Sequence, residues 1–251
     1  MRGVRWAVII MAFCLTPTLG YPAPVGQNKT PPVGESTAGI SRAGIVTADF
    51  SCLSGRILQM ESGWHYAGYD EKAVVVNVPG PSLAKKYGIY RDLGEIRHPA
   101  TRQVLGHLIA DVGVLRLVDL EADRQAAIIE RSFTEVKVGD LLGPVAAFPT
   151  IPAQNPVAGA PRVSGSVVAV QDLRTLAVSP DVIYLDIGRE QGLAPGDRFF
   201  VRSAALAGPD RFKGEMTILR VTPQTATAVL TSTTHEVLPG DRVVSSETAP
   251  F

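Results

Sequence analysis

The sequence has little cysteine and, beyond its first residues, no long apolar run. Only Cys14 and Cys52 occur among 251 residues, so a hydrophobic core rather than a disulfide framework must hold the fold. We interpret Cys52 as a small buried apolar side chain; an intermolecular disulfide or reactive thiol is the alternative. After residues 6–15 no apolar stretch approaches the roughly 18 residues of a membrane helix, so we expect no membrane span in the mature chain.

An excess of charge of one sign is also absent. Lys plus Arg and Asp plus Glu number 24 each, so nothing indicates a basic surface, and we expect no nucleic-acid partner. Hydrophobic residues make up 45% and charged residues 19% of the chain, which predicts a folded core rather than disorder.

Motifs of known chemistry are scarce as well. The four histidines fit no local metal-binding spacing, and no phosphate-binding glycine loop occurs. Ser82-Leu-Ala-Lys85 matches the S-x-x-K pattern of penicillin-binding serine enzymes, but the S-D-N and K-T-G elements that should follow are missing. We therefore expect a protein that is not an enzyme and that has no cofactor and no metal.

The N-terminus has the three parts of a secretory signal peptide. Arg2 and Arg5 precede the apolar run 6–15, and small residues follow near Gly20. We expect residues 1–20 to be removed near Gly20 and the protein to be periplasmic or secreted. An uncleaved anchor is the alternative.

Proline and glycine divide the remainder of the chain. The segments 21–53 and 144–163 lack hydrophobic periodicity and predict a flexible leader and an extended linker. The predicted divisions are a signal peptide (1–20), a leader (21–53), a first β module (54–143), a linker (144–163), a second β module (164–246) and a tail (247–251).

The two modules repeat each other. Residues 113–141 align without gaps on 214–242 at an offset of 101, pairing glycine with glycine and one Gly-Asp pair with another. Self-similarity over this length indicates a duplicated domain. Weaker matches upstream pair 54–60 with 164–170, 75–78 with 184–187, 83–84 with 193–194, and 89–91 with 200–202.

The repeat also decides between helix and strand. Residues 120–133 suit a helix by propensity, but their partner 222–234 is rich in threonine and alternates, as strands do. We predict an all-β fold of two tandem small β-barrel or sandwich modules, each with about six strands. In the second module these fall near 164–171, 182–188, 198–203, 214–222, 225–232 and 241–245.

Three Gly-Asp pairs are the most conspicuous polar feature: Gly139-Asp140, Gly196-Asp197 and Gly240-Asp241. We interpret them as structural turns, in which glycine takes a left-handed conformation and aspartate bonds nearby backbone. The first and third pairs recur at matching places in the two modules, which favours this role over metal binding. The first module lacks the middle pair and has Lys86-Tyr87-Gly88 there, a loss that a metal site would not be expected to survive.

An aromatic cluster occurs in the first module alone. Trp64, His65, Tyr66 and Tyr69 lie in its first long turn, where the second module has the aromatic-free DLRTLA of 172–177. Aromatic side chains on a loop can stack on sugar rings or anchor a protein partner. These four residues are the candidate partner or glycan contact, and local packing is the alternative.

Turn-forming segments recur along both modules. The second module has VIYLDIG (182–188), GLAPGDRF (192–199), GEM (214–216) and EVLPGDR (236–242), and the first has YR (90–91), HPATRQVLG (98–106) and EVKVGD (135–140). Through these segments the second module resembles the C-terminal domain of flagellar assembly protein T and the β-domains that follow LysM modules in bacterial envelope proteins. The first module resembles the preceding repeat of those LysM-associated proteins and departs from it at His98, where aspartate is expected. No LysM module is present.

The resemblance implies a non-enzymatic periplasmic envelope protein, a scaffold or assembly factor of the flagellar basal body or another envelope complex. Its partner would be an envelope protein. One alternative is a module that binds peptidoglycan or another carbohydrate through the loop from Trp64 to Tyr69. The second alternative is an envelope hydrolase.

Overall fold

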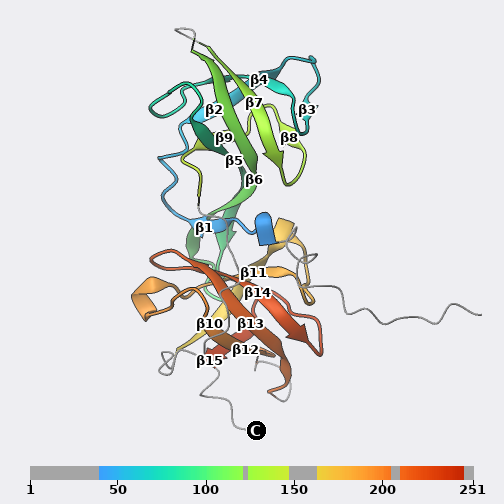
Figure 1. Ribbon diagram of the computed structural model, residues 1–251. Coiled ribbons are helices and arrows are strands. Elements are labelled where there is room, and N and C mark those ends of the chain that lie inside the picture. Colours follow the sequence, from blue (N-terminus) through green and yellow to red (C-terminus); the bar gives the residue numbers. More distant parts are fainter. Residues whose placement is uncertain (1–39, 121–123, 147–162, 205–209, 246–251) are drawn as a thin grey trace, which may run out of the picture. The chain divides into compact units, whose positions relative to one another are not determined.

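The computed structural model describes residues 40–120, 124–146, 163–204 and 210–245. The predicted signal peptide, the first part of the leader, most of the linker and the tail lie outside these ranges. The described residues belong to one compact unit, 33–251. The predicted all-β class is confirmed, since the chain forms two closed six-stranded barrels (Figure 1).

The first barrel closes through antiparallel pairing of every neighbour in the order β6-β5-β9-β2-β4-β7 and back to β6. Strand β1 pairs with the N-terminal part of β6, and β3 and β8 form a separate two-stranded sheet. The barrel strands are β2 (Gly55–Met60), β4 (Lys72–Val76), β5 (Lys86–Arg97), β6 (Val104–Leu120), β7 (Gln125–Ser132) and β9 (Leu141–Gly143); the others are β1 (Ile45–Thr47), β3 (Tyr66–Ala67) and β8 (Val136–Lys137).

The second barrel has the same circular order, β13-β12-β15-β10-β11-β14 and back to β13. All six strands predicted for this module are present, with ends that differ by at most three residues. The internal repeat is therefore real at the level of topology. The strands are β10 (Ser164–Val170), β11 (Val182–Leu185), β12 (Arg198–Arg202), β13 (Phe212–Val221), β14 (Ala226–Thr233) and β15 (Arg242–Ser245), with 3-10 turns at Gln171–Leu173 and Arg189–Gln191.

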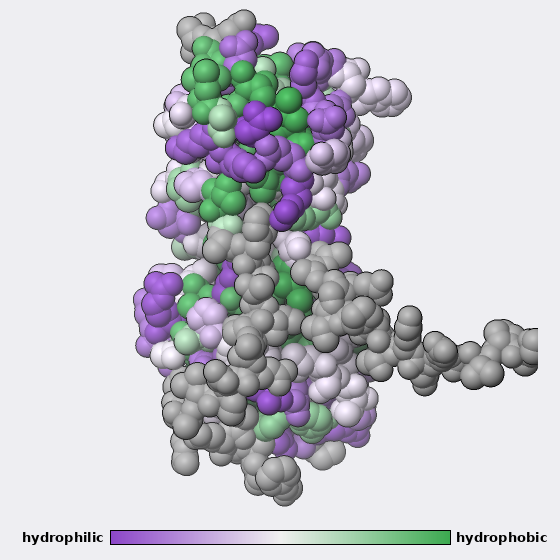
Figure 2. Space-filling model, viewed as in Figure 1, coloured by the Kyte–Doolittle hydropathy of each residue, from purple (hydrophilic) through white to green (hydrophobic). Residues whose placement is uncertain are grey.

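Equivalent side chains fill both barrels. Tyr87 and Phe199 are the largest inward residues, and each is fully buried. Branched aliphatic residues from every strand surround them, as the period-2 alternation of strands requires. The outer surface is mixed, with hydrophobic and hydrophilic residues side by side over the first barrel in Figure 2.

The glycines at offset 101 have a steric reason to repeat. A Cβ on Gly113 would lie 2.3 Å from the carbonyl oxygen of Arg131, and one on Gly214 would lie 2.3 Å from that of Ser232. The register shifts beside both glycines, between β6 and β7 and between β13 and β14. Only glycine lets the two strands approach so closely at these bulges.

Three of the weaker upstream matches are off by one or two residues. The backbone N–H groups of Ala84 and Gly196 donate to Leu117 and Ile218, which are 101 residues apart, so Ala84 corresponds to Gly196 rather than to Ala194. By the same register Val75 corresponds to Leu185, and Ile89 to Val201. The sequence matches pair identical residue types, whereas strand pairing matches positions that face the barrel interior. A slip of one residue moves a side chain to the opposite face of its strand.

The prediction of a flexible leader up to residue 53 is wrong for residues 40–53. Ile40, Ala43 and Val46 are buried, and β1 pairs with β6. The hydroxyl groups of Tyr184 and Thr225 donate to the carbonyl oxygens of Ala43 and Val46, at 2.6 Å each. The segment is too short for its alternation to stand out in the sequence, but its backbone is bonded along both edges.

Candidate functional site

The predicted contact residues lie on an exposed loop between β2 and β4, residues 61–71, which we call the aromatic loop. Trp64, Tyr66 and Tyr69 are 73%, 55% and 75% exposed, and His65 is exposed as well. Large aromatic side chains this open to water are costly to leave unburied. Local packing does not account for Trp64 or Tyr69.

The base of the aromatic loop is bonded to the barrel. The backbone N–H of Glu61 donates to Lys72 at 2.8 Å, and that of Asp70 donates to Ile129 at 2.8 Å. Within the loop, β3 pairs with β8 and the side chain of Ala67 is buried. The barrel thus holds the start, middle and end of the loop, and the aromatic side chains project from fixed backbone.

Polar groups accompany the aromatic rings. The ammonium of Lys137 lies 5.2 Å from the ring centroid of Tyr66, within cation–π range. The Ser62 hydroxyl donates to the Glu71 carboxylate. Aromatic faces flanked by a cation and a carboxylate can anchor a protein partner or stack on a sugar ring.

The second barrel presents a different loop at this place. The bridge between Ala177 and Val237 corresponds to that between Ala67 and Val136, so Leu176 stands where the first barrel has Tyr66. Leu173 and Leu176 are 48% and 44% exposed. The shared frame carries aromatic residues in one barrel and aliphatic residues in the other.

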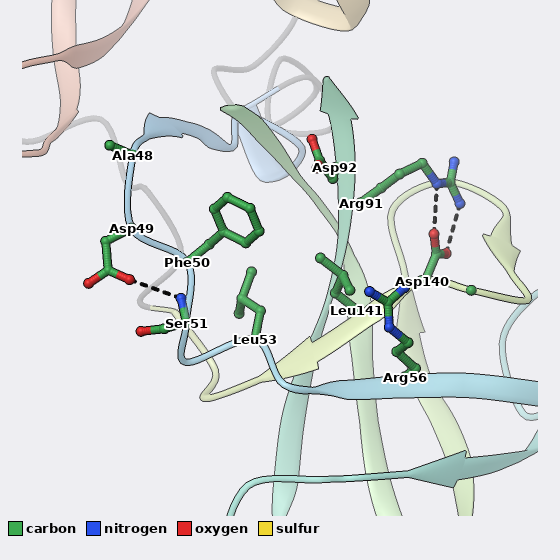
Figure 3. A pocket seen from close by; sticks show the side chains of 11 residues that line it. Ala48, Asp49, Phe50, Ser51, Leu53, Arg56, Arg91, Asp92, Asp140 and Leu141 are labelled. Carbon is green, nitrogen blue, oxygen red and sulfur yellow. Dashed lines mark hydrogen bonds and ion pairs between the residues drawn. The ribbon is translucent and has the colours of Figure 1, made fainter. Parts of the chain in front are cut away.

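A second candidate, which we call the Arg56 pocket, opens beside the segment 48–53 (Figure 3). It measures about 620 Å³. The sequence does not indicate it, because five of its eleven lining residues come from the predicted leader, and the others come from β2, β5, β9 and the Gly139-Asp140 turn, which only the fold brings together. The lining residues are Ala48, Asp49, Phe50, Ser51, Leu53, Arg56, Arg91, Asp92, Gly139, Asp140 and Leu141.

One cation of the Arg56 pocket, Arg91, is already paired with a carboxylate. The Arg91 guanidinium donates to both oxygens of the Asp140 carboxylate, Nε to Oδ1 and Nη2 to Oδ2, each at 2.8 Å, and to the Glu135 carbonyl. The hydrogen bond with Asp140 raises the pKa of Arg91. Elsewhere on the rim, the Ser51 backbone N–H lowers the pKa of the Asp49 carboxyl.

The Gly-Asp pairs form turns of one kind. Gly139, Gly196 and Gly240 have φ values of 95°, 99° and 100°. The carboxylates of Asp140, Asp197 and Asp241 each accept the backbone N–H three residues earlier, at 2.7, 2.8 and 2.7 Å. Asp140 and Asp241 are also paired with a cation, Arg91 and Lys213 respectively.

The remaining candidates of the sequence lie apart from one another. His98 contacts Asp186 through Nε2 at 3.1 Å, and His107 contacts Asp92 through Nδ1 at 2.9 Å. Ser82 and Lys85 form a turn in which the Lys85 N–H donates to the Ser82 carbonyl at 3.1 Å. Among the described residues, no three His, Cys, Asp or Glu side chains are grouped to hold a metal ion.

The expectation that Cys52 is buried is wrong, since its side chain is exposed. It belongs to the segment 48–53, which lies on the outer surface of the barrel. Cys52 lines a small apolar hollow of about 190 Å³ together with Phe50 and Tyr90.

None of the helical turns in the described ranges has the length and apolar character to cross a membrane. No protein-family model matches the chain, and no curated protein sequence matches it.

Proposed function

We propose that the chain is a non-enzymatic protein of the bacterial cell envelope, exported to the periplasm, where it serves as a scaffold or assembly factor. Its partner is an envelope protein that it contacts through the aromatic loop. The resemblance to flagellar assembly protein T makes the flagellar basal body one candidate for the complex concerned.

The exposure of three aromatic side chains on one anchored loop carries this proposal. Burying Trp64, Tyr66 and Tyr69 in an interface would remove a large apolar area from water, at about 25 cal/mol per Å². Because the loop is bonded at its base, little backbone entropy remains to be lost on binding. Rigid, exposed aromatic residues of this kind are typical hot spots of protein interfaces.

Crosslinking and pull-down of the tagged full chain from periplasm tests the proposal. We expect the same envelope proteins to be recovered repeatedly with the native chain and to be lost with Trp64→Ala/Tyr69→Ala. The matched control is Leu173→Ala/Leu176→Ala in the equivalent loop of the second barrel, which should recover the same proteins as the native chain. Equal recovery with all three chains would refute a contact through the aromatic loop.

A carbohydrate-binding module is the second candidate, favoured by the open ring faces of Trp64 and Tyr69 and the neighbouring carboxylate of Glu71. Sedimentation of the pure chain with isolated peptidoglycan sacculi separates the two functions. Binding that Trp64→Ala abolishes, without any protein partner, would support the carbohydrate module and contradict the scaffold.

A further inference from the structure

We propose that the Arg56 pocket binds a monocarboxylate with an apolar body, which ion-pairs with Arg56 and lies on Phe50, Leu53 and Leu141. This site is separate from the aromatic loop, and the proposal goes beyond the function proposed above.

The apolar floor of the pocket is built from two separate segments. Phe50 and Leu53 project from the segment 48–53 toward Leu141 of β9 (Figure 3). In the ladder between β2 and β9, Leu141 is paired with Arg56, so the guanidinium stem begins directly beside this floor. A ligand that contacts the leucines is therefore within reach of the cation.

The segment that carries Phe50 is bonded within itself and packs against the barrel. The Asp49 carboxylate accepts the Ser51 N–H at 3.0 Å, and the Leu53 N–H donates to the Phe50 carbonyl at 2.9 Å. The Phe50 ring lies against His107, with 5.2 Å between ring centroids. These contacts preorganise the apolar wall, which lowers the entropic cost of binding.

Arg56 differs from its neighbour Arg91 in having no partner among the described residues. Its guanidinium makes no hydrogen bond or ion pair in the part of the chain that the structure describes, whereas Arg91 is paired with the Asp140 carboxylate and donates to the Glu135 carbonyl. A guanidinium presents its N–H groups in a planar fork that matches the two oxygens of a carboxylate. Arg56 thus offers the polar end of a site whose other end is apolar.

The charges around Arg56 disfavour a dianion more than a monoanion. Asp49 and Asp92 also line the pocket; Asp92 contacts His107, and Asp140 is paired with Arg91. Repulsion by these carboxylates grows with the charge of the ligand, and among the described lining residues Arg56 is the cation without a partner. A monocarboxylate needs only the fork of Arg56, and the volume of about 620 Å³ suits a small ligand.

The second barrel lacks this arrangement at the equivalent place. Its register pairs Ser166 with Arg242, where the first barrel pairs Arg56 with Leu141. The free cation is replaced by a hydroxyl, and the leucine is replaced by a cation. The fold alone therefore does not require the combination found in the first barrel.

Two kinds of ligand share this chemistry, the C-terminus of an apolar peptide and a fatty acid. The test uses the full chain and isothermal titration calorimetry with four probes: N-acetyl-Leu-Phe, its C-terminal amide, decanoate and decanol. We expect at least one acid to bind at least about tenfold more tightly than its neutral counterpart, the usual scale for a charge-assisted hydrogen-bonded pair. Binding of the peptide acid alone, of decanoate alone, or of both identifies the source.

Arg56→Gln should abolish the preference for acid over neutral probe, and Arg56→Lys should restore it in part. Phe50→Ala should weaken both members of a pair equally. Arg189→Gln, an exposed arginine of the second barrel, is the matched control and should leave binding unchanged. Failure of both acids to bind, equal binding of acid and neutral probe, or an unchanged preference in Arg56→Gln would overturn the proposal. All variants are first compared by thermal unfolding.

Discussion

Inside the two barrels, Tyr87 of one corresponds to Phe199 of the other, and the strands around them close in the same circular order. Outside, the loop after the first strand carries three exposed aromatic residues in one barrel and two exposed leucines in the other. Packing constraints explain why the interior and the turns at Gly139-Asp140 and Gly240-Asp241 are alike in the two barrels, whereas Ala84-Lys85 stands where the second barrel has Gly196-Asp197. What differs on a shared frame is where binding has to be sought, and both candidate sites lie on the first barrel.

Removing the aspartates that recur in both barrels should have the largest effect on the stability of the protein. Asp140→Ala and Asp241→Ala should each lower the free energy of unfolding by about 3 kcal/mol, because each leaves a largely buried cation and a backbone N–H without a partner. Urea unfolding at neutral pH measures both.

Asp197→Ala is the control for this pair. Asp197 bonds the same kind of turn, but no ion pair reaches its carboxylate in the described ranges, so we expect a loss of about 1 kcal/mol. If Asp197→Ala costs as much as the other two substitutions, the ion pairs add nothing to the turns.

The next largest effect should come from the repeated glycines. Gly113→Ala and Gly214→Ala should each cost about 2 kcal/mol, since the new Cβ would lie 2.3 Å from a carbonyl oxygen in both barrels. Gly68→Ala, where no atom lies within 4 Å of the added Cβ, should be nearly neutral in the same unfolding experiment. Clearly unequal costs at the two repeated positions would contradict their steric equivalence.

Tyr90 is a difference between the two barrels, because Arg202 occupies the equivalent position in the second barrel. Its hydroxyl donates to the Pro144 carbonyl at 2.6 Å and accepts the Ala146 N–H at 2.9 Å. Tyr90→Phe should therefore cost about 1 kcal/mol at neutral pH, measured by urea unfolding.

The same substitution should change the alkaline stability of the protein. Burial raises the pKa of Tyr90 from 10.0 to about 12. The unfolded chain loses this proton first, so the stabilisation by Tyr90 is complete below pH 10 and is lost as the pH rises through about 12. Tyr90→Phe should flatten the decline in this window, which urea unfolding over the alkaline range measures.

Much of the fold could be predicted because the sequence contains two copies of the same module. A Thr-rich strand in one copy decided the structure of an ambiguous segment in the other, and β7 and β14 are both strands. The upstream registers could not be predicted to the residue, since bulges move the alignment by one or two positions. The burial and strand pairing of residues 40–53 could not be predicted from the sequence, because the partners of these residues are distant in sequence. The Gly44 N–H, for example, donates to the Asp111 carboxylate.

Of the two candidate sites, one could be predicted from the sequence and the other could not. The aromatic loop could be found from the sequence, because it is the composition that differs between the copies. The Arg56 pocket could not, because Phe50, Arg56 and Leu141 come together only through strand pairing and a segment without periodicity.

The most direct test of the claim that binding belongs to the first barrel uses a fluorine label at Trp64. The chain has two tryptophans, Trp6 and Trp64, so 5-fluorotryptophan in a Trp6→Phe background gives a single ¹⁹F resonance. We predict that periplasmic envelope proteins shift or broaden this resonance and do so equally when Leu173 and Leu176 are replaced by alanine. A resonance unchanged by these proteins, while pull-down still recovers a partner, would contradict the account.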